Sequence, residues 1–233
     1  MLKEVAAENF RRFSENEYPG RVIVVGSLGD NNEVQVYALM GRSPNSRNRK
    51  FVYENGIVKT APIDPSKVKD PSLIIYKAMM ERAGLHIVTN GDQTDTIFNH
   101  MLHSAYGFER AMRERTFEPD EPNYTPRISA ISGNGHGAAK FGVLSRSTDG
   151  RCERAIYEYD RIPPGYGYCL HTYAGDGDPL PAFTARPYLV PLGGDTAEAV
   201  SNHFWNALNR ENRVALVTKH IDVSLDKVKV HII

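Results

Sequence analysis

The chain has few cysteines and no long hydrophobic run. Its 233 residues include two cysteines, Cys152 and Cys169, too few for a disulfide framework or a four-cysteine zinc site. We expect free thiols in a reducing cytoplasm, with one disulfide between them as the alternative. No apolar stretch approaches the roughly 20 residues that cross a bilayer, and the first residues, MLKEVAAENFRRF, lack the apolar segment of a secretory signal. The sequence therefore predicts a cytoplasmic protein with no membrane partner.

The sequence also has no excess of either charge. Its 28 lysines and arginines balance 28 aspartates and glutamates, so the formal net charge is zero. Nonspecific nucleic-acid binding needs a basic surface, so nucleic acid is not an expected partner, whereas a local basic pocket for a small anion is compatible with this balance. The hydrophobic share of 41% is that of a globular protein that can bury a core.

The motifs of several common enzyme classes are missing. The glycine-rich residues 133–140 lack the GxxxxGK[ST] of a P-loop, and they lie between two predicted strands, which disfavours a dinucleotide site. There is no GxSxG, and no HExxH accompanies His100 and His103. Residues 175–179 lack the glutamate that closes an EF-hand loop. We therefore expect no metal and no cofactor.

The sequence does contain many strand patterns separated by turn residues. Residues 33–40 alternate apolar and polar positions, and the GDNN turn before them predicts a hairpin with residues 21–28. Asn55-Gly56, within residues 51–60, is the strongest short hairpin signal. Residues 73–90 form either a third hairpin or a short helix followed by a strand. Further strands are predicted over residues 127–132, 138–147, 153–160, 166–173, 213–220 and 227–233.

Helical patterns are fewer. They cover residues 3–15, residues 94–114 with Gly107 as a point of division, and a helix capped by Asp195-Thr196. Because strand–strand pairs outnumber strand–helix–strand units, an α+β fold is favoured over a doubly wound parallel sheet. The sequence shows no clear domain boundary, so residues 1–233 are predicted to form a single domain.

Three polar clusters are candidate sites. GRSPNSRNR, residues 41–49, contains three arginines, whose guanidinium forks suit phosphate, and Arg21 on a neighbouring strand belongs to the same expected surface. TNGDQTD, residues 89–95, precedes a helix and suits capping or anion binding. EPDEPNYTPR, residues 118–127, is a proline-stiffened loop suited to placing a carboxylate. The alternatives are a solvated loop, a capping segment and an acidic surface loop.

These clusters occur in one order. Tyr18-Pro19-Gly20-Arg21 comes first, followed by the GRSPNSRNR cluster, then by TNGDQTD and finally by NYTPRI at residues 123–128. This ordered set, spanning residues 18–132, resembles the archaeal-type IMP cyclohydrolase family. The resemblance implies a four-layer αββα sandwich of two mostly antiparallel sheets, similar to the fold of the N-terminal-nucleophile hydrolases. Residues 1–17 then form a helical addition.

The resemblance also implies a reaction. It is the closure of 5-formamidoimidazole-4-carboxamide ribonucleotide to IMP with loss of water, the last step of purine synthesis. Because the attacking amide and the formyl group share one ring, the enzyme must supply orientation, proton transfer and donors for a developing oxyanion. No metal, redox cofactor or covalent intermediate is required.

Positions in the family pattern imply the roles of individual residues. Tyr76 and Glu118 are expected to be catalytic, with an arginine or the hydroxyl of Tyr76 or Tyr124 facing the oxyanion. The expected substrate-binding residues are Arg21, Arg42, Ser46, Arg47, Asn48, Arg49, Asn90, Asp92, Thr94, Tyr124 and Arg127.

Two other interpretations stay open. One is an amidohydrolase on the same architecture, although Met1-Leu2 offers no N-terminal serine, threonine or cysteine. The other is a noncatalytic purine-nucleotide-binding protein. Residues 174–187 are predicted to be a lid or a plain surface loop, and a homo-oligomer is compatible with such an enzyme.

Overall fold

The alternating strands form two antiparallel sheets. The computed structural model describes residues 1–68, 71, 74–82, 84–133 and 137–233. Within them, a six-stranded sheet has the order β11-β10-β1-β2-β12-β13, and a seven-stranded sheet runs from β3 to β9 in sequence order. The first sheet consists of β1 (Arg21–Gly29), β2 (Asn32–Met40), β10 (Tyr166–His171), β11 (Tyr188–Pro191), β12 (Arg213–Asp222) and β13 (Lys227–Ile232). The second consists of β3 (Arg49–Glu54), β4 (Ile57–Pro62), β5 (Lys77–Arg82), β6 (Leu85–Thr89), β7 (Arg127–Ser132), β8 (Ala139–Arg146) and β9 (Cys152–Tyr159).

Turn chemistry fixes the predicted hairpins. Asp30 and Asn31 both adopt positive φ, 47° and 60°, between β1 and β2, as a tight two-residue turn requires. Asn55 and Gly56, with φ of 51° and 78°, turn β3 into β4. Residues 77–89 are a hairpin of β5 and β6, so the alternative of a helix there is wrong for the described residues. Outside the described residues lie 69–70, 72–73, 83 and 134–136. They include parts of the predicted segment 73–90 and of the glycine-rich residues 133–140.

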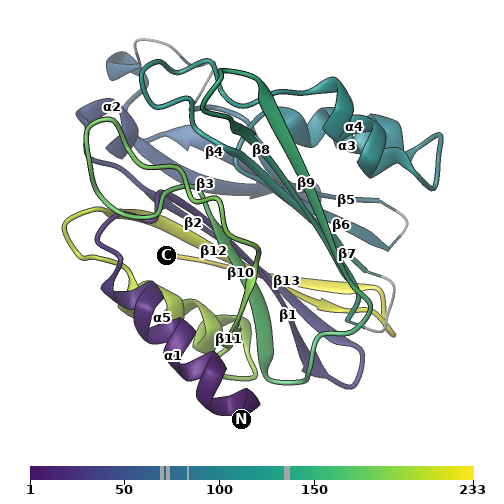
Figure 1. The fold of residues 1–233 in the computed structure, drawn as a ribbon. Coiled ribbons are helices and arrows are strands. Elements are labelled where there is room, and N and C mark those ends of the chain that lie inside the picture. Colours follow the sequence, from purple (N-terminus) through teal and green to yellow (C-terminus); the bar gives the residue numbers. More distant parts are fainter. Residues whose placement is uncertain (69–70, 72–73, 83, 134–136) are drawn as a thin grey trace.

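Helices cover the outer face of each sheet (Figure 1). The first sheet is covered by α1 (Leu2–Glu15) and α5 (Ala197–Ala207), and α5 begins where the Thr196 side chain accepts a hydrogen bond from Ala199 N. The second is covered by α3 (Gln93–Met101) and α4 (Gly107–Glu114). The predicted helix of residues 94–114 divides between Met101 and Gly107, and glycine at 107 allows α4 to begin against α3, because a Cβ there would lie 2.5 Å from the His100 carbonyl carbon. The α+β architecture and its four layers are confirmed.

Some elements were not apparent in the sequence. The polar cluster of residues 41–49 contains the short helix α2 (Pro44–Arg47), a 3₁₀ turn, η1, covers Pro65–Lys67, and β11 follows the predicted loop of residues 174–187. Cys152 and Cys169 are free, so the alternative of a disulfide is wrong. No helix among the described residues is long and apolar enough to cross a membrane.

A hydrophobic core joins the two sheets, and one end of the sandwich carries the polar residues 41–49. Ile23, Leu39, Val58 and Phe141 are buried in this core. Arg21, at the start of β1, pairs with Leu39 near the end of β2. The strand β2 therefore delivers residues 41–49 to the end of the sandwich at which β1 begins.

Candidate functional site

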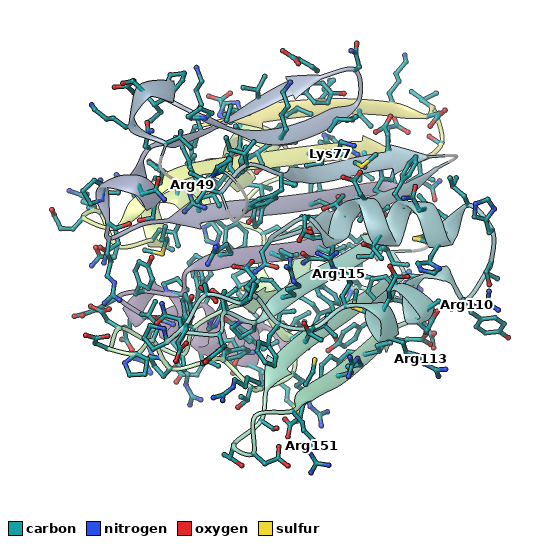
Figure 2. The ribbon with its side chains drawn as sticks, turned by 90° about the horizontal axis from the view of Figure 1, so that it is seen from above. Arg49, Lys77, Arg110, Arg113, Arg115 and Arg151 are labelled. Carbon is teal, nitrogen blue, oxygen red and sulfur yellow. The ribbon has the colours of Figure 1, made fainter. Side chains whose placement is uncertain are left out.

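A cavity of about 410 Å³ opens at the end of the sandwich where β1 begins. Both sheets and two long loops contribute to it. Its lining residues are Tyr18, Arg21, Met40, Arg42, Ser43, Asn45, Ser46, Arg49, Ile74, Glu118, Asp120, Asn123, Tyr173 and Leu180. Figure 2 shows Arg49 within the body of the protein, apart from the surface cations Arg110 and Arg151. Five of the predicted site residues, Arg21, Arg42, Ser46, Arg49 and Glu118, thus lie on one cavity.

The Arg49 side chain is buried, and that of Arg21 is 12% exposed. Arg49 is 2% exposed, and its Nε donates to Ser46 O at 2.8 Å and its Nη2 to Met40 O at 3.2 Å. Its Nη1 and the Nε of Arg21 are buried without a hydrogen-bond partner in the described part of the chain. Burial, with Arg21 nearby, lowers the pKa of Arg49. Because buried donors are nearly always satisfied, these two side chains are arranged to receive an anionic or strongly accepting ligand.

Glu118 faces this arginine pair from the irregular loop between α4 and β7. The Glu118 side chain is buried, and its Oε2 lies 3.4 Å from Arg21 Nη2. Burial raises the pKa of Glu118, against the opposing effects of Arg21 and Arg127. For Arg21, burial disfavours the charge, but Glu118 and the phenols of Tyr173 and Tyr76 hold its pKa well above the usual value. A carboxyl group whose pKa is raised is suited to proton transfer near neutral pH.

Tyr76 lies beside this site without lining the cavity. Its hydroxyl oxygen is 2.5 Å from that of Tyr37, and both side chains are buried. Burial, followed by the neighbouring Tyr76, raises the pKa of Tyr37 well above its usual value. Arg21 and Arg49 both interact electrostatically with Tyr76, so this hydrogen-bonded pair of phenols lies next to the two arginines.

Arg127 and Asp92 form a layer behind Glu118. Arg127 Nη1 donates to Asp92 Oδ1 at 2.6 Å and to Gln93 Oε1 at 2.8 Å, and Arg115 contacts the other Asp92 oxygen. A Cβ at Gly91 would lie 2.7 Å from Arg127 Nη1 and 3.3 Å from Glu118 Oε1. The glycine of the TNGD sequence therefore allows Glu118 and Arg127 to approach this backbone.

The other predicted binding residues lie outside the lining of the cavity. Arg47 donates to the carbonyls of Gly41 and Glu211, and the Asn48 amide bonds with the backbone of Asp64 at 2.7 and 2.8 Å. Arg146 lies over the Tyr124 ring, 4.1 Å from its centroid.

Asn90 and Thr94 are also engaged with the protein itself. Asn90 is fully buried and bonds with Pro126 O, Ile128 N and Gln93 Nε2. Thr94 Oγ1 bonds with Thr89 and with the carbonyl of Gly91. These side chains hold loops against strands. The sequence motif alone does not show whether such a side chain has this structural role or binds a ligand.

Sequence reasoning missed part of the lining. Tyr173 and Leu180 come from the loop after β10, and Asn123 Oδ1 accepts a hydrogen bond from Leu180 N at 3.0 Å. Arg42 contacts Asp176, donates to Gly177 O at 3.1 Å, and lies over the Tyr18 ring at 5.0 Å. Tyr18 could have been predicted, since it directly precedes the Pro19-Gly20-Arg21 sequence. The loop after β10 has no sequence motif that would assign Tyr173 or Leu180 to the cavity.

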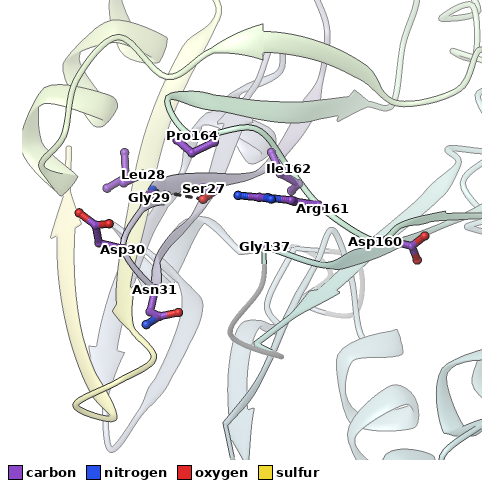
Figure 3. Close-up of a pocket in the computed structure, with 10 residues that line it drawn as sticks. All are labelled: Ser27, Leu28, Gly29, Asp30, Asn31, Gly137, Asp160, Arg161, Ile162 and Pro164. Carbon is purple, nitrogen blue, oxygen red and sulfur yellow. Dashed lines mark hydrogen bonds between the residues drawn. The ribbon is translucent and has the colours of Figure 1, made fainter.

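A larger cavity, of about 790 Å³, lies at the opposite end of β1 (Figure 3). Its side chains diverge: Figure 3 shows Arg161 extending toward Ser27, with Asp30 and Asp160 on opposite sides. Buried charged groups converge on the smaller cavity, which is therefore the better candidate. In the described part of the chain, no cluster of three or more histidine, cysteine, aspartate or glutamate side chains is arranged to hold a metal ion.

The fold and the cavity together define an antiparallel αββα protein with a cavity lined by arginines and a buried carboxyl group. A sequence model of the family described as IMP cyclohydrolase-like protein matches residues 18–226. The chain belongs to this family, and α1 precedes the matched region.

Two archaeal relatives support the same family. The chain is 33% identical over 119 residues to a protein named IMP cyclohydrolase from Methanopyrus kandleri, and 32% identical over 126 residues to one of the same name from Methanothrix thermoacetophila. Each similarity covers 49% of this chain, and it covers 58% and 57% of the two relatives, respectively. The chain thus matches somewhat more than half the length of these relatives.

Proposed function

We propose that the protein is an IMP cyclohydrolase, which closes 5-formamidoimidazole-4-carboxamide ribonucleotide to IMP and releases water. The observation that carries this proposal is the convergence of the buried Glu118 and Arg49 with Arg21 on one cavity. Family membership and two relatives with this name support it. The substrate is then a purine nucleotide precursor, and its phosphate supplies the anion that the arginines are arranged to receive.

The proposed chemistry needs two proton movements. The carboxamide nitrogen attacks the formyl carbon, and a proton moves from this nitrogen to the formyl oxygen. The formamide nitrogen then loses a proton, a C=N bond forms, and the hydroxyl leaves as water after gaining a proton. In our proposal, Glu118 carries these protons, because burial raises its pKa.

The charged and phenolic neighbours have separate tasks in this proposal. Arg21, with Tyr76 close by, stabilises the oxygen that becomes negative when the formyl carbon is attacked. Arg42 and Ser46 at the mouth of the cavity bind the phosphate with Arg49 deeper inside. Arg127 and Asp92 hold Glu118 in place from behind.

A direct assay tests the function. We would incubate the purified protein with the formamido ribonucleotide and follow IMP by chromatography against a blank without enzyme. Catalytic formation of IMP supports the proposal. If folded protein forms no IMP but binds it in calorimetry, the protein is a purine-nucleotide-binding module instead. If it neither forms nor binds IMP, both assignments fail.

Arg42 and Arg47 give a test and a control for the phosphate contact. They lie five residues apart, but Arg42 lines the cavity, whereas Arg47 bonds backbone carbonyls outside it. We expect Arg42→Ala to weaken IMP binding about tenfold, the effect of losing a hydrogen bond to a charged group. Arg47→Ala should leave the affinity near that of the wild type and lower the melting temperature, because Arg47 holds the carbonyls of Gly41 and Glu211. Calorimetry and thermal unfolding measure both effects. Equal affinities of the two variants would contradict the assignment of Arg42.

A further inference from the structure

Two stacked tyrosines form one wall of the cavity. Tyr18 and Tyr173 both line it, and their ring centroids are 5.9 Å apart with 20° between the ring planes. Both side chains are buried. A Cβ at Gly20, whose φ is +77°, would lie 2.4 Å from Cδ2 of Tyr173. The glycine thus lets the Tyr173 ring lie directly against the backbone that leads into Arg21.

A single side-chain amide joins the backbones of these two tyrosines. Asn16 Oδ1 accepts a hydrogen bond from Tyr18 N at 2.9 Å, and Asn16 Nδ2 donates to Tyr173 O at 3.2 Å. His171 Nδ1 also bonds to Tyr173 O at 2.9 Å. The tyrosines are 155 residues apart in the sequence, and Asn16 adds to the backbone hydrogen bonds from Thr172 N and Tyr173 N to Pro19 O that also join these two segments.

Asn16 belongs to the helix outside the family match. It is the residue that ends α1, where its N–H bonds to Phe13 O at 3.2 Å. Phe13 is buried in the outer core of the first sheet, against Phe204 of α5, so the end of α1 has a fixed position. The family match begins at residue 18, so this support of the cavity wall lies outside the matched region.

We propose that Asn16 is a positioning residue for ligand binding. It holds the Tyr18–Tyr173 wall in place, and with it the shape of the cavity that the ligand enters, so the end of α1 becomes a determinant of affinity. The identity of the ligand as a purine nucleotide rests on the proposed function, whereas the role of Asn16 in holding the wall does not.

Asn9 offers a matched control on the same helix. Its Nδ2 donates to Leu189 O of β11 at 2.9 Å, and in the described part of the chain it makes no hydrogen bond to Tyr18 or Tyr173. Asn9→Ala removes a half-buried amide that bonds α1 to Leu189 O of β11, and Asn16→Ala removes one that bonds Tyr18 N and Tyr173 O at the end of α1. Asn9→Ala therefore controls for a weakened attachment of α1, and a difference between the variants at the cavity reports the lost bonds to the two tyrosines.

Two measurements test the inference. Hydrogen–deuterium exchange should show faster exchange over residues 172–183 in Asn16→Ala but not in Asn9→Ala. Calorimetry with IMP should show about tenfold weaker binding for Asn16→Ala alone, and steady-state kinetics should show a raised KM with kcat nearly unchanged. A purely structural role for Asn16 would lower the melting temperature without separating the two variants in affinity or KM.

The outcomes separate this inference from the proposed function. If Asn16→Ala and Asn9→Ala have the same exchange over residues 172–183, or the same affinity for IMP, the positioning role is wrong. If the wild type neither binds nor forms IMP, the proposed function fails. The exchange comparison then decides alone whether Asn16 holds the wall.

Discussion

Glu118→Gln should reduce kcat about 10²–10⁴-fold, the range for loss of a group that transfers protons in the transition state. Glutamine has nearly the same shape, but it carries no titratable proton. Glu118 is buried and lies 3.4 Å from Arg21, and in the proposed reaction its carboxyl group faces the reacting nitrogen and oxygen. Steady-state kinetics of IMP formation measure the effect.

The controls separate catalysis from folding. Glu109→Gln changes a glutamate of α4 that bonds Lys140 at 2.7 Å, away from the cavity, and it should leave kcat unchanged. Glu118→Asp keeps a carboxyl group and should retain more activity than Glu118→Gln. If Glu118→Gln is folded and has a kcat within about threefold of the wild type, Glu118 does not transfer the protons.

Acid should destabilise the fold strongly through two buried histidines. Burial, followed by the charge of Lys219, lowers the pKa of His86 from 6.5 to about 3. Burial lowers the pKa of His171 from 6.5 to about 4, although the Tyr173 carbonyl opposes this. The native state keeps both rings neutral at pH 5, whereas the unfolded chain protonates them below pH 6.5. The unfolded state then binds more protons, so stability is present above pH 6.5 and is lost as the pH falls.

The expected loss is on the order of 3–4 kcal/mol between pH 7 and pH 5, about half from each ring. Denaturant unfolding at the two pH values measures it. His171→Phe, among the rings of Phe13, Phe183 and Tyr188, should remove about half of the pH dependence. His103→Gln, at an exposed position, should remove none. The raised pKa of Glu118 acts in the opposite direction, so the difference between variant and wild type is the quantity to compare. Equal pH dependence in His171→Phe and the wild type would contradict this origin.

Local chemistry made most of the fold predictable. Alternating residues and the Asp30-Asn31 and Asn55-Gly56 turns define the hairpins without help from distant parts of the chain. The pairing of β10 with β1 is a contact between segments more than a hundred residues apart, and neither strand contains a local signal for it. The sequence therefore left residues 174–187 open between a lid and a plain surface loop, and only the structure shows Leu180 of this loop in the lining of the cavity.

The candidate site was predictable only in part for a related reason. Arg21, Arg49 and Glu118 were identified from residue type and order, and the cavity brings them together. Asn48 and Asn90 have the same chemistry in the sequence, but their amides bond with backbone groups. Whether a polar side chain faces a ligand or a neighbouring loop depends on the tertiary position of that loop, which one sequence does not contain.

The cavity draws on both sheets, and this has a mechanical consequence. Arg21 belongs to β1 of one sheet and Arg49 to β3 of the other. The core between the two sheets includes Ile23 and Phe141. This core sets the position of Arg21 relative to Arg49 as well as stabilising the fold, because close-packed interiors transmit displacements rather than absorb them. A small slip of one layer over the other would move the two guanidinium groups apart while every strand stays intact. Activity in such a protein is thus sensitive to volume changes far from the ligand, and it can decline before the fold does.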